Sequence, residues 1–437
     1  MTTYVVKQGR CLSGVLHMPG DKSISHRAVI LGSLASGRTV INGLLEAEDV
    51  QSTIRAFREM GVSISKLDEK SYEIIGVGLK GLKEPNRNLH LGNSGTAIRL
   101  LCGVLVGQSF DCILTGDESL RSRPMTRVTD PLGKMGANIR TTSGGVAPIM
   151  VMPKGNLTGI HYETAVASAQ VKSALLLAGL YATGSTVISE PQLSRDHTER
   201  MLRNFGCPVQ VDGNTTRIQS VEGITGKNIS IPGDLSSAAF FIVAATIADK
   251  SQIELKGIGF NPTRTGLIDI LREMGADIVV TRRYESVGEP LVDLIVRSSQ
   301  LRGINVPPGM VPRLIDEFPI LAVAAAAAQG VTRISGANEL RFKESDRITS
   351  VVAGLRSLGV SADETADGMI IEGGTILGGT VDSCGDHRVA MAFAIAGVLA
   401  KDSVRVLNCD NIATSFPEFD EVSTVMGLDL LKETSDP

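Results

Sequence analysis

The stretch from Arg27 to Ile64 reads RAVILGSLASG at 27–37, RTVINGL at 38–44 and IRAFREMGVSI at 54–64. Its first segment is rich in Ala, Leu and Gly and is apolar on nearly every face, which predicts a buried helix. The second segment is β-branched and predicts a strand, and the third predicts a helix that ends at a glycine before another strand. Because helices and strands alternate, the stretch indicates an α/β fold.

This pattern occurs six times along the chain. The copies begin near residues 23, 94, 168, 236, 316 and 387, so successive starts lie 71, 74, 68, 80 and 71 residues apart. The later first helices are marked by TAIRLLCGVLVG (96–107), AQVKSALLLAGLYATG (169–184), AAFFIVAATIA (238–248), ILAVAAAAAQG (320–330) and VAMAFAIAGVLA (389–400). Regular repeats of this kind divide naturally into two domains of three. With turns around Pro19 and Pro232 as boundaries, we predict an inserted domain over 21–232 and a discontinuous domain over 1–20 plus 233–437.

Composition restricts the function. The chain has 437 residues, of which 43% are apolar, so burial can offset chain entropy and wholesale disorder is excluded. The 43 basic and 47 acidic residues give a net charge of −4, which argues against a nucleic-acid partner. The longest apolar run, Ile320–Ala328, is far shorter than the roughly 20 residues of a membrane span. The 6 cysteines are scattered and form no C-x-x-C pair, which indicates a reducing compartment without a disulfide framework. Together with the short apolar runs, this leads us to expect a soluble cytoplasmic protein without a membrane partner.

Charged residues gather where the predicted helices begin, in segments such as GDKSISHR (20–27), RFKESDR (341–347) and GDHRVA (385–390). A helix N-terminus offers unpaired N–H groups and the positive end of the helix dipole, so it favours anions. Cations at these starts in a net-acidic chain predict small anionic ligands, phosphates or carboxylates. The cations are Lys22, Arg27, Arg123, Arg195, Lys343, Arg347 and Arg388.

Two alternatives stay open for these segments. Ser, Asp and Asn at helix starts are also ordinary caps, and a single neighbouring Arg is usually a solvated surface charge. Asp316 and Glu344, which lie among the cations, are candidate proton carriers, but either could form a salt bridge instead. No His pair has metal-ligand spacing and no Gly-rich nucleotide loop is present, so we expect no metal and no cofactor.

Long motifs resemble those of the enolpyruvyl transferases. They include PGDKSISHRA (19–28), LGNSGTAIR (91–99), SRPM (122–125), SAQVKSALLLAGL (168–180), SRDHTER (194–200), IDEFP (315–319), RFKESDR (341–347), GDHRVAMA (385–392) and ATSFPEF (413–419). The motifs cover nearly the whole chain and most resemble the branch that acts on shikimate 3-phosphate. The resemblance implies a two-domain inside-out α/β barrel with six βαβαββ repeats, three per domain, and helix N-termini that face the interdomain cleft.

The resemblance also implies a reaction and a set of site residues. Phosphoenolpyruvate would give its enolpyruvyl group to the 5-hydroxyl of shikimate 3-phosphate, with release of phosphate. Asp316 would take the hydroxyl proton and Glu344 would protonate C3, and Lys22 is counted with them as catalytic. The shikimate 3-phosphate ligands would be Lys22, Ser23, Arg27, Ser168, Ala169 (through its backbone), Gln170, Arg195, Asp316 and Lys343. The phosphoenolpyruvate ligands would be Lys22, Gly95, Arg123, Gln170, Arg347 and Arg388.

The chain departs from many family members at two positions. Thr414 stands where a Lys is common, so one cation expected at phosphoenolpyruvate is missing, and Ala169 replaces a Ser. These changes resemble the class II branch, in which Arg195 would substitute as a phosphate ligand. Glyphosate is expected as an inhibitor at the phosphoenolpyruvate site beside Gly95, and a monomer is expected.

Two rival functions remain open for this sequence. The first is the sister enzyme that acts on UDP-N-acetylglucosamine, which resembles this chain but places a Cys in the loop corresponding to TGDESLRSRPM (115–125). That loop has no Cys here, and the nearest, Cys112, precedes it on a predicted strand. The second is a non-catalytic anion-binding scaffold, which would have no need of both Asp316 and Glu344.

Overall fold

The computed structural model describes residues 2–9, 11–153 and 155–434. The chain divides into two compact units. Unit 1 comprises Met1–Pro19, Pro232–Tyr284 and Pro290–Pro437. Unit 2 comprises Gly20–Ile231 and the short segment Glu285–Glu289.

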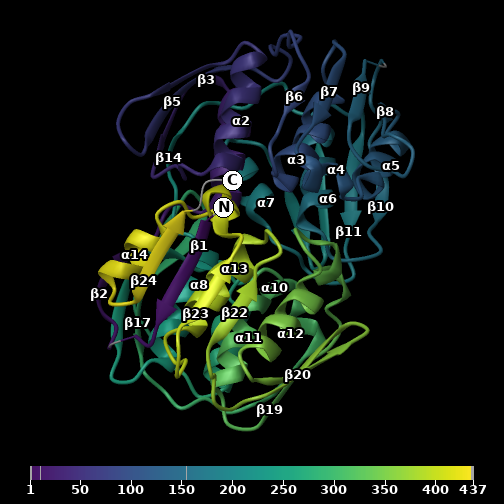
Figure 1. Ribbon diagram of the computed structural model, residues 1–437. Helices are drawn as coiled ribbons and strands as arrows, with labels where there is room; N and C mark the ends of the chain where they lie inside the picture. The colour runs from purple at the N-terminus through teal and green to yellow at the C-terminus, as the bar shows by residue number, and fades with distance from the viewer. Residues whose placement is uncertain (1, 10, 154, 435–437) are drawn as a thin grey trace. The chain divides into compact units, whose positions relative to one another are not determined.

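Unit 2 contains three four-stranded sheets among the described residues (Figure 1). Their strand orders are β14-β3-β5-β4, β6-β7-β9-β8 and β10-β11-β13-β12. In each sheet the first pair is parallel and the next two pairs are antiparallel. The strands are β3 (Ser36–Asn42), β4 (Ser63–Lys66), β5 (Ser71–Val77), β6 (Leu89–His90), β7 (Cys112–Thr115), β8 (Asn138–Arg140), β9 (Ile149–Met152), β10 (His161–Glu163), β11 (Ser185–Ser189), β12 (Gln210–Asp212), β13 (Thr215–Gln219) and β14 (Asn228–Ser230).

Unit 1 contains three further four-stranded sheets in its described part, with the orders β16-β17-β15-β2, β18-β19-β21-β20 and β22-β23-β1-β24. Each again combines a parallel pair with antiparallel neighbours. The strands are β1 (Thr2–Lys7), β2 (Ser13–His17), β15 (Gln252–Gly259), β16 (Asp277–Ser286), β17 (Glu289–Arg297), β18 (Asn305–Val306), β19 (Val331–Ile334), β20 (Ser361–Thr365), β21 (Gly368–Glu372), β22 (Gly379–Asp382), β23 (Val404–Leu407) and β24 (Asp429–Thr434). The predicted α/β fold is therefore confirmed, with mixed sheets.

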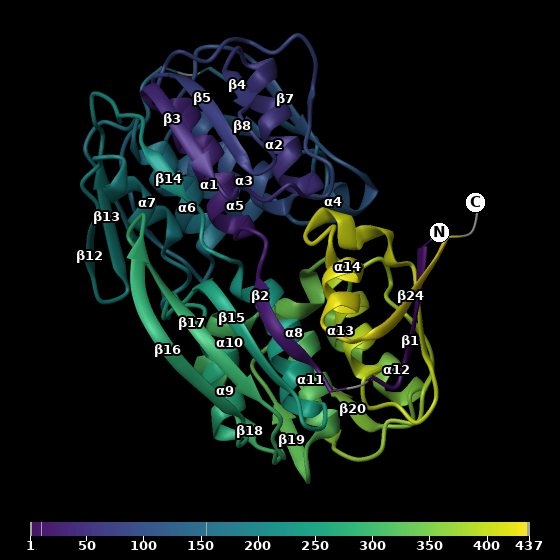
Figure 2. The same ribbon diagram turned by 90° about the vertical axis from the view of Figure 1, so that its left-hand side faces the viewer.

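The start of the chain completes two sheets of unit 1. Strand β1 lies between β23 and β24, and Tyr4 pairs with Val406 on one side and Lys432 on the other. Strand β2 pairs in parallel with β15, beside β17 and β16 (Figure 2). Residues from both ends of the sequence therefore share the hydrophobic core of unit 1, where Tyr4 and Val406 are buried.

The first helix of each copy is buried, as its composition predicted. All 13 residues of α8 (Leu235–Ile247) are buried, as is every residue from Ile24 to Leu34 in α1 (Lys22–Leu34). The other four such helices are α3 (Gly95–Leu105), α6 (Ala169–Gly179), α11 (Phe318–Ala327) and α13 (His387–Ala396). In unit 1, α8, α11 and α13 pack on one another, and in unit 2, α3 packs on α6. Ala and Gly permit this close packing because they leave room for neighbouring backbones.

The remaining helices are shorter or amphipathic. Unit 2 has α2 (Glu48–Glu59), α4 (Glu118–Ser122), α5 (Thr126–Lys134) and α7 (His197–Asn204). Unit 1 has α9 (Gly266–Glu273), η1 (Pro308–Met310), α10 (Val311–Leu314), η2 (Asn338–Phe342), α12 (Arg347–Ser357), η3 (Cys409–Thr414) and α14 (Phe419–Val425). Across the described residues, no helix combines the length and the apolar character that crossing a membrane requires.

Gly103 tests the helix packing of unit 2. A Cβ at Gly103 of α3 would lie 2.1 Å from the carbonyl oxygen of Ala174 on α6, so Gly103→Ala forces the two helices apart. We expect this overpacking to lower the free energy of unfolding by about 1–3 kcal/mol, measured by urea denaturation. The control is Gly133→Ala on α5, where a Cβ meets no atom within 4 Å. The control should raise stability by about 0.4–1 kcal/mol, and equal effects of the two substitutions would contradict the close approach.

Candidate active site

The predicted helix starts are real, and most of them carry side-chain caps. The Asp21 carboxylate accepts a hydrogen bond from the Ile24 N–H at 2.9 Å at the start of α1. Ser94 caps α3 and Ser168 caps α6 in the same way, by accepting from Ala97 and Val171. The capping interpretation is therefore correct for these three residues. It does not account for the cations that follow them, whose side chains turn to other partners.

Lys22 and Arg27 project from α1 of unit 2. The Lys22 ammonium lies 2.5 Å from the Asp49 carboxylate. Arg27 is buried and donates to the Thr198 hydroxyl at 2.6 Å, the Ser173 hydroxyl at 2.9 Å and the Ser23 carbonyl at 2.8 Å. Burial, together with the positive charge of Arg195, lowers the pKa of Arg27 to about 10, so this guanidinium still carries its charge at neutral pH. The predicted ligands Ser23 and Arg27 are thus in contact, and Arg195 is near enough for its charge to act on Arg27.

A second group surrounds the start of α3. Gln170 donates to Thr96 at 3.2 Å and accepts from Arg99 at 2.7 Å. Arg123 donates to Asn93 and, at 3.2 Å, to Ser119. A Cβ built on Gly95 would lie 2.8 Å from Nη1 of Arg99 and 3.0 Å from Nη1 of Arg123. The structure therefore joins the predicted ligands Gly95, Arg123 and Gln170.

Sequence reasoning missed Arg99 in this group. Its side chain is buried, and its Nη1 also donates to the Gly95 carbonyl at 3.3 Å. The spacing from Gly95 to Arg99 is one helical turn, which was the available signal. The cationic part of the site is therefore larger than the sequence indicated.

In unit 1, Asp316 lies among three predicted cations. Its carboxylate is 3.4 Å from Lys343, 3.6 Å from Arg347 and 3.8 Å from Arg388. Arg388 also donates to the Asp316 carbonyl at 3.2 Å. Glu344 lies 2.7 Å from Arg347, so that all five predicted residues of this unit form one cluster.

Arg347 is the centre of this cluster. Its side chain is 1% exposed, and its Nε lies 2.7 Å from the Asp386 carboxylate, which is fully buried. Burial opposes the charged form of Arg347, but Asp386 and Glu344 outweigh it and raise the pKa of the guanidinium. Burial likewise opposes ionisation of Asp386, yet contact with Arg347 lowers the pKa of that carboxyl. Asp386 was not among the predicted residues, although it caps α13 by accepting from the Arg388 N–H at 2.9 Å.

The sequence also singled out Ala169 and Thr414. Ala169 is the first residue of α6, which leaves its backbone at the helix N-terminus. Thr414 ends η3, and its hydroxyl donates to the Asn411 carbonyl at 2.7 Å. Within the described ranges, no group of three or more His, Cys, Asp or Glu side chains could hold a metal ion.

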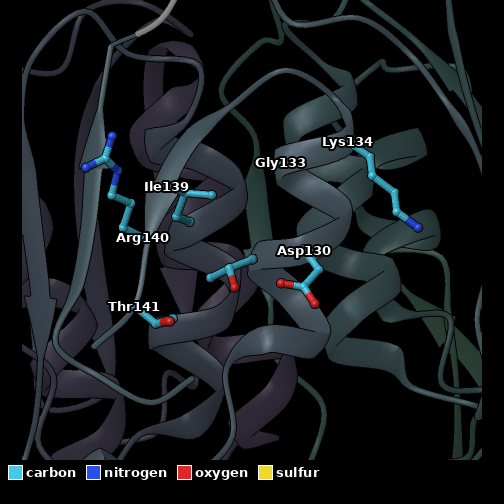
Figure 3. Close-up of a pocket in the computed structure, with 7 residues that line it drawn as sticks. Asp130, Gly133, Lys134, Ile139, Arg140 and Thr141 are labelled. Atoms are coloured by element: carbon cyan, nitrogen blue, oxygen red, sulfur yellow. The ribbon is translucent and has the colours of Figure 1, made fainter. Parts of the chain in front are cut away.

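A separate hollow of about 760 Å³ lies on unit 2 beside α5 and β8 (Figure 3). Its lining comprises Thr129, Asp130, Gly133, Lys134, Ile139, Arg140 and Thr141. The charged ends of Lys134 and Arg140 point away from each other, so they do not converge on one anion. The hollow contains no predicted site residue and carries no part of the site.

The fold and the clusters of charged residues identify an α/β protein whose helix N-termini are suited to binding small anions. The family model of EPSP synthase (3-phosphoshikimate 1-carboxyvinyltransferase) matches residues 6–422. A 3-phosphoshikimate 1-carboxyvinyltransferase from Methylococcus capsulatus is 54% identical over 422 residues, which are 97% of this chain and 97% of the relative. One from Nitrosococcus oceani is 54% identical over 425 residues, or 97% and 96% of the two chains. A solved structure of EPSP synthase from Acinetobacter baumannii superposes with a TM-score of 0.89 at 45% identity and covers 99% of this chain and 100% of that one.

The chain belongs to the EPSP synthase family. It is a transferase of the shikimate pathway, and its reaction joins the carboxyvinyl group of phosphoenolpyruvate to shikimate 3-phosphate and releases phosphate.

The buried pair of Arg347 and Asp386 makes a prediction about pH. Asp386→Asn keeps a cap for α13 but removes the only fully buried carboxylate among the ion-pair partners described for Arg347, so we expect a loss of about 3–5 kcal/mol of stability at pH 7. Because the pKa of Asp386 is lowered in the fold, its contribution is complete above the unfolded pKa of about 3.9 and is lost as pH falls through the folded value. The difference between wild type and variant should therefore shrink below about pH 4, measured by urea denaturation across pH.

The matched control is Asp363→Asn. Asp363 pairs with Arg356 at 2.7 Å, but the two side chains are 74% and 57% exposed, so we expect a change below about 1 kcal/mol. A loss at Asp386 no larger than that at Asp363 would contradict the role assigned to the buried pair.

Proposed function

We propose that the two groups of unit 2, at the starts of α1 and α3, and the Asp316 cluster of unit 1 supply the ligands and proton carriers of the enolpyruvyl transfer. Shikimate 3-phosphate would bind Lys22, Ser23, Arg27, Ser168, the Ala169 backbone, Gln170, Arg195, Asp316 and Lys343. Phosphoenolpyruvate would bind Lys22, Gly95, Arg123, Gln170, Arg347 and Arg388. The observation that carries the proposal is Asp316, whose carboxylate has three cations within 3.8 Å while Glu344 shares one of them. An acid, a base and anion ligands thus lie in one cluster, as the reaction requires.

The proposed steps balance as an addition followed by an elimination. Glu344 gives a proton to C3 of phosphoenolpyruvate while the 5-hydroxyl oxygen bonds to C2 and its proton passes to Asp316. In the elimination, the bond between C2 and the phosphate oxygen breaks and phosphate leaves, taking up the proton held by Asp316. Glu344, now deprotonated, takes one proton from the new methyl group, and the electrons of that C–H bond restore the double bond. Cations at the phosphate and carboxylate stabilise the charge that develops, and Lys22 is placed with the catalytic residues for this reason.

The proposal extends to organisation and setting. We propose that units 1 and 2 are the two domains, that each holds three βαβαββ repeats, and that the whole is an inside-out α/β barrel. The strand order common to all six sheets supports the repeats. A monomer, a cytoplasmic location and the absence of a membrane partner remain part of the proposal, as does inhibition by glyphosate.

The sister reaction on UDP-N-acetylglucosamine is disfavoured by Cys112. The thiol lies on β7, is buried, and burial raises its pKa to about 12, so it does not act as an exposed acid or nucleophile. Phosphate release from phosphoenolpyruvate with each acceptor separates the two functions. We expect release with shikimate 3-phosphate, whereas release only with UDP-N-acetylglucosamine would overturn the proposal.

Glu344→Gln and Asp316→Asn test the proton carriers. Both substitutions keep side-chain size and remove proton transfer, so we expect kcat to fall by about 10²–10⁴-fold with smaller changes in the substrate KM values. Asp363→Asn, on an exposed strand of the same unit, is the control and should retain wild-type kcat. Near-normal turnover in both variants would show that the acid and base are other groups.

Gly95→Ala tests the phosphoenolpyruvate site with glyphosate. The added methyl would press on the guanidinium ends of Arg99 and Arg123, which must shift. Glyphosate is longer than phosphoenolpyruvate and depends more on that space, so its inhibition constant should rise about tenfold more than the phosphoenolpyruvate KM. Gly133→Ala is the control because its methyl touches nothing. A wild-type protein that resists glyphosate, or equal losses for both ligands, would show that Gly95 does not set this selectivity.

A further inference from the structure

Besides the buried Arg347 cluster of unit 1, a buried ionic cluster lies in unit 2, and it has no part in the proposed chemistry. The Lys172 ammonium on α6 is 2.7 Å from the Glu190 carboxylate and 2.8 Å from that of Glu199 on α7. The three side chains are at most 2% exposed. Burial opposes the charged form of Lys172, but the two carboxylates outweigh it and raise the pKa of the ammonium. The ammonium of Lys172 therefore stays charged inside the protein, with two carboxyl groups as its partners.

A buried ionic cluster needs an explanation other than stability. Taking charges out of water costs several kcal/mol per ion, and well-packed apolar side chains often stabilise as much. The excess carboxylate here adds to that cost, and one oxygen of Glu199 is buried with no hydrogen-bond partner. We therefore expect the cluster to hold neighbouring backbone segments in a fixed position.

Glu190 shows what is fixed. One of its carboxylate oxygens accepts the backbone N–H of Ser168 at 3.2 Å, and the other accepts the backbone N–H of Ser194 at 3.4 Å. Ser168 is the cap of α6, and Ser194 directly precedes Arg195. The ammonium of Lys172 donates to the Ser194 carbonyl at 3.4 Å, and the backbone N–H of Lys172 donates to the Ser168 carbonyl. One carboxylate thus joins two segments that are distant in sequence.

We propose that Glu190 is a positioning residue for shikimate 3-phosphate. Held by Lys172, its carboxylate sets the spacing between the Ser168 turn and the loop that carries Arg195, so that both reach the same substrate. This inference rests on the proposed function, in which both segments supply ligands. Glu190 itself touches no reacting atom.

Glu190→Gln tests the role with the least disturbance. The substitution keeps size and one carbonyl oxygen, so only one of the two backbone N–H groups retains its acceptor, while Lys172 and Glu199 remain a neutral pair. We expect the KM for shikimate 3-phosphate to rise about tenfold, the effect of one charge-assisted hydrogen bond. The KM for phosphoenolpyruvate, measured with saturating shikimate 3-phosphate, and kcat should stay within about threefold of wild type.

Glu199→Gln is the matched comparison. It removes the same charge from the same ammonium, but Glu199 accepts no hydrogen bond from either backbone segment that Glu190 joins. We expect Glu190→Gln and Glu199→Gln to lower the unfolding temperature by similar amounts. In Glu199→Gln, however, the KM for shikimate 3-phosphate should rise by less than about threefold. Glu190→Asp provides a second test, because it keeps the charge that Lys172 requires but is too short to span both segments, so its KM should also rise.

The possible outcomes distinguish failure of the positioning role from failure of the proposed function. Equal effects of Glu190→Gln and Glu199→Gln on the KM for shikimate 3-phosphate, or an unchanged KM in Glu190→Gln and Glu190→Asp, would overturn the positioning role and leave a purely structural cluster. A wild-type protein that neither binds nor turns over shikimate 3-phosphate would instead contradict the proposed function.

Discussion

The buried guanidinium of Arg347 is the constraint on which the unit 1 cluster depends. A cation that is 1% exposed can remain charged only if carboxylates surround it, and Asp386, Glu344 and Asp316 all lie within 3.6 Å. Asp386 neutralises it from the start of α13, while Asp316 and Glu344 approach it from the segments before α11 and α12. The same contacts that stabilise the charge therefore hold two carboxylates in one cluster with Lys343 and Arg388, and we propose these carboxylates as the base and the acid.

The fold explains why such clusters can form at all. Each described sheet combines one parallel pair of strands with antiparallel neighbours, and one of the six buried helices precedes a strand of that parallel pair in the chain. These helices begin with caps, and the residues beside the caps face partners far away in sequence, such as Arg27 with Thr198. In unit 2 the close approach at Gly103 brings α3 against α6, which places Gly95, Arg99 and Gln170 in one group. Helix packing thus decides which charged ends meet.

Much of this could be predicted from local patterns. The buried helices, their caps and the cations beside them follow from composition and period, because those signals lie within one or two turns of chain. Asp49, Asp386 and Glu190 could not be predicted as partners, because each meets its cation across 18 or more residues and its role depends on tertiary position. Arg99 was missed for a different reason. It reads as part of an apolar helix, and only the close contact with Gln170 of α6 shows that its guanidinium turns toward the site.

Turnover in D₂O tests most directly whether C3 of phosphoenolpyruvate accepts a proton during the reaction, which the role proposed for Glu344 requires. The side chain of Glu344 is 23% exposed, so it exchanges its proton with solvent between turnovers. The account predicts that product formed in D₂O from phosphoenolpyruvate and shikimate 3-phosphate carries deuterium on its vinyl carbon, detected by proton NMR and mass spectrometry. Product that forms at the normal rate with only hydrogen at that carbon would contradict it, because C3 would then never have accepted a proton from the site.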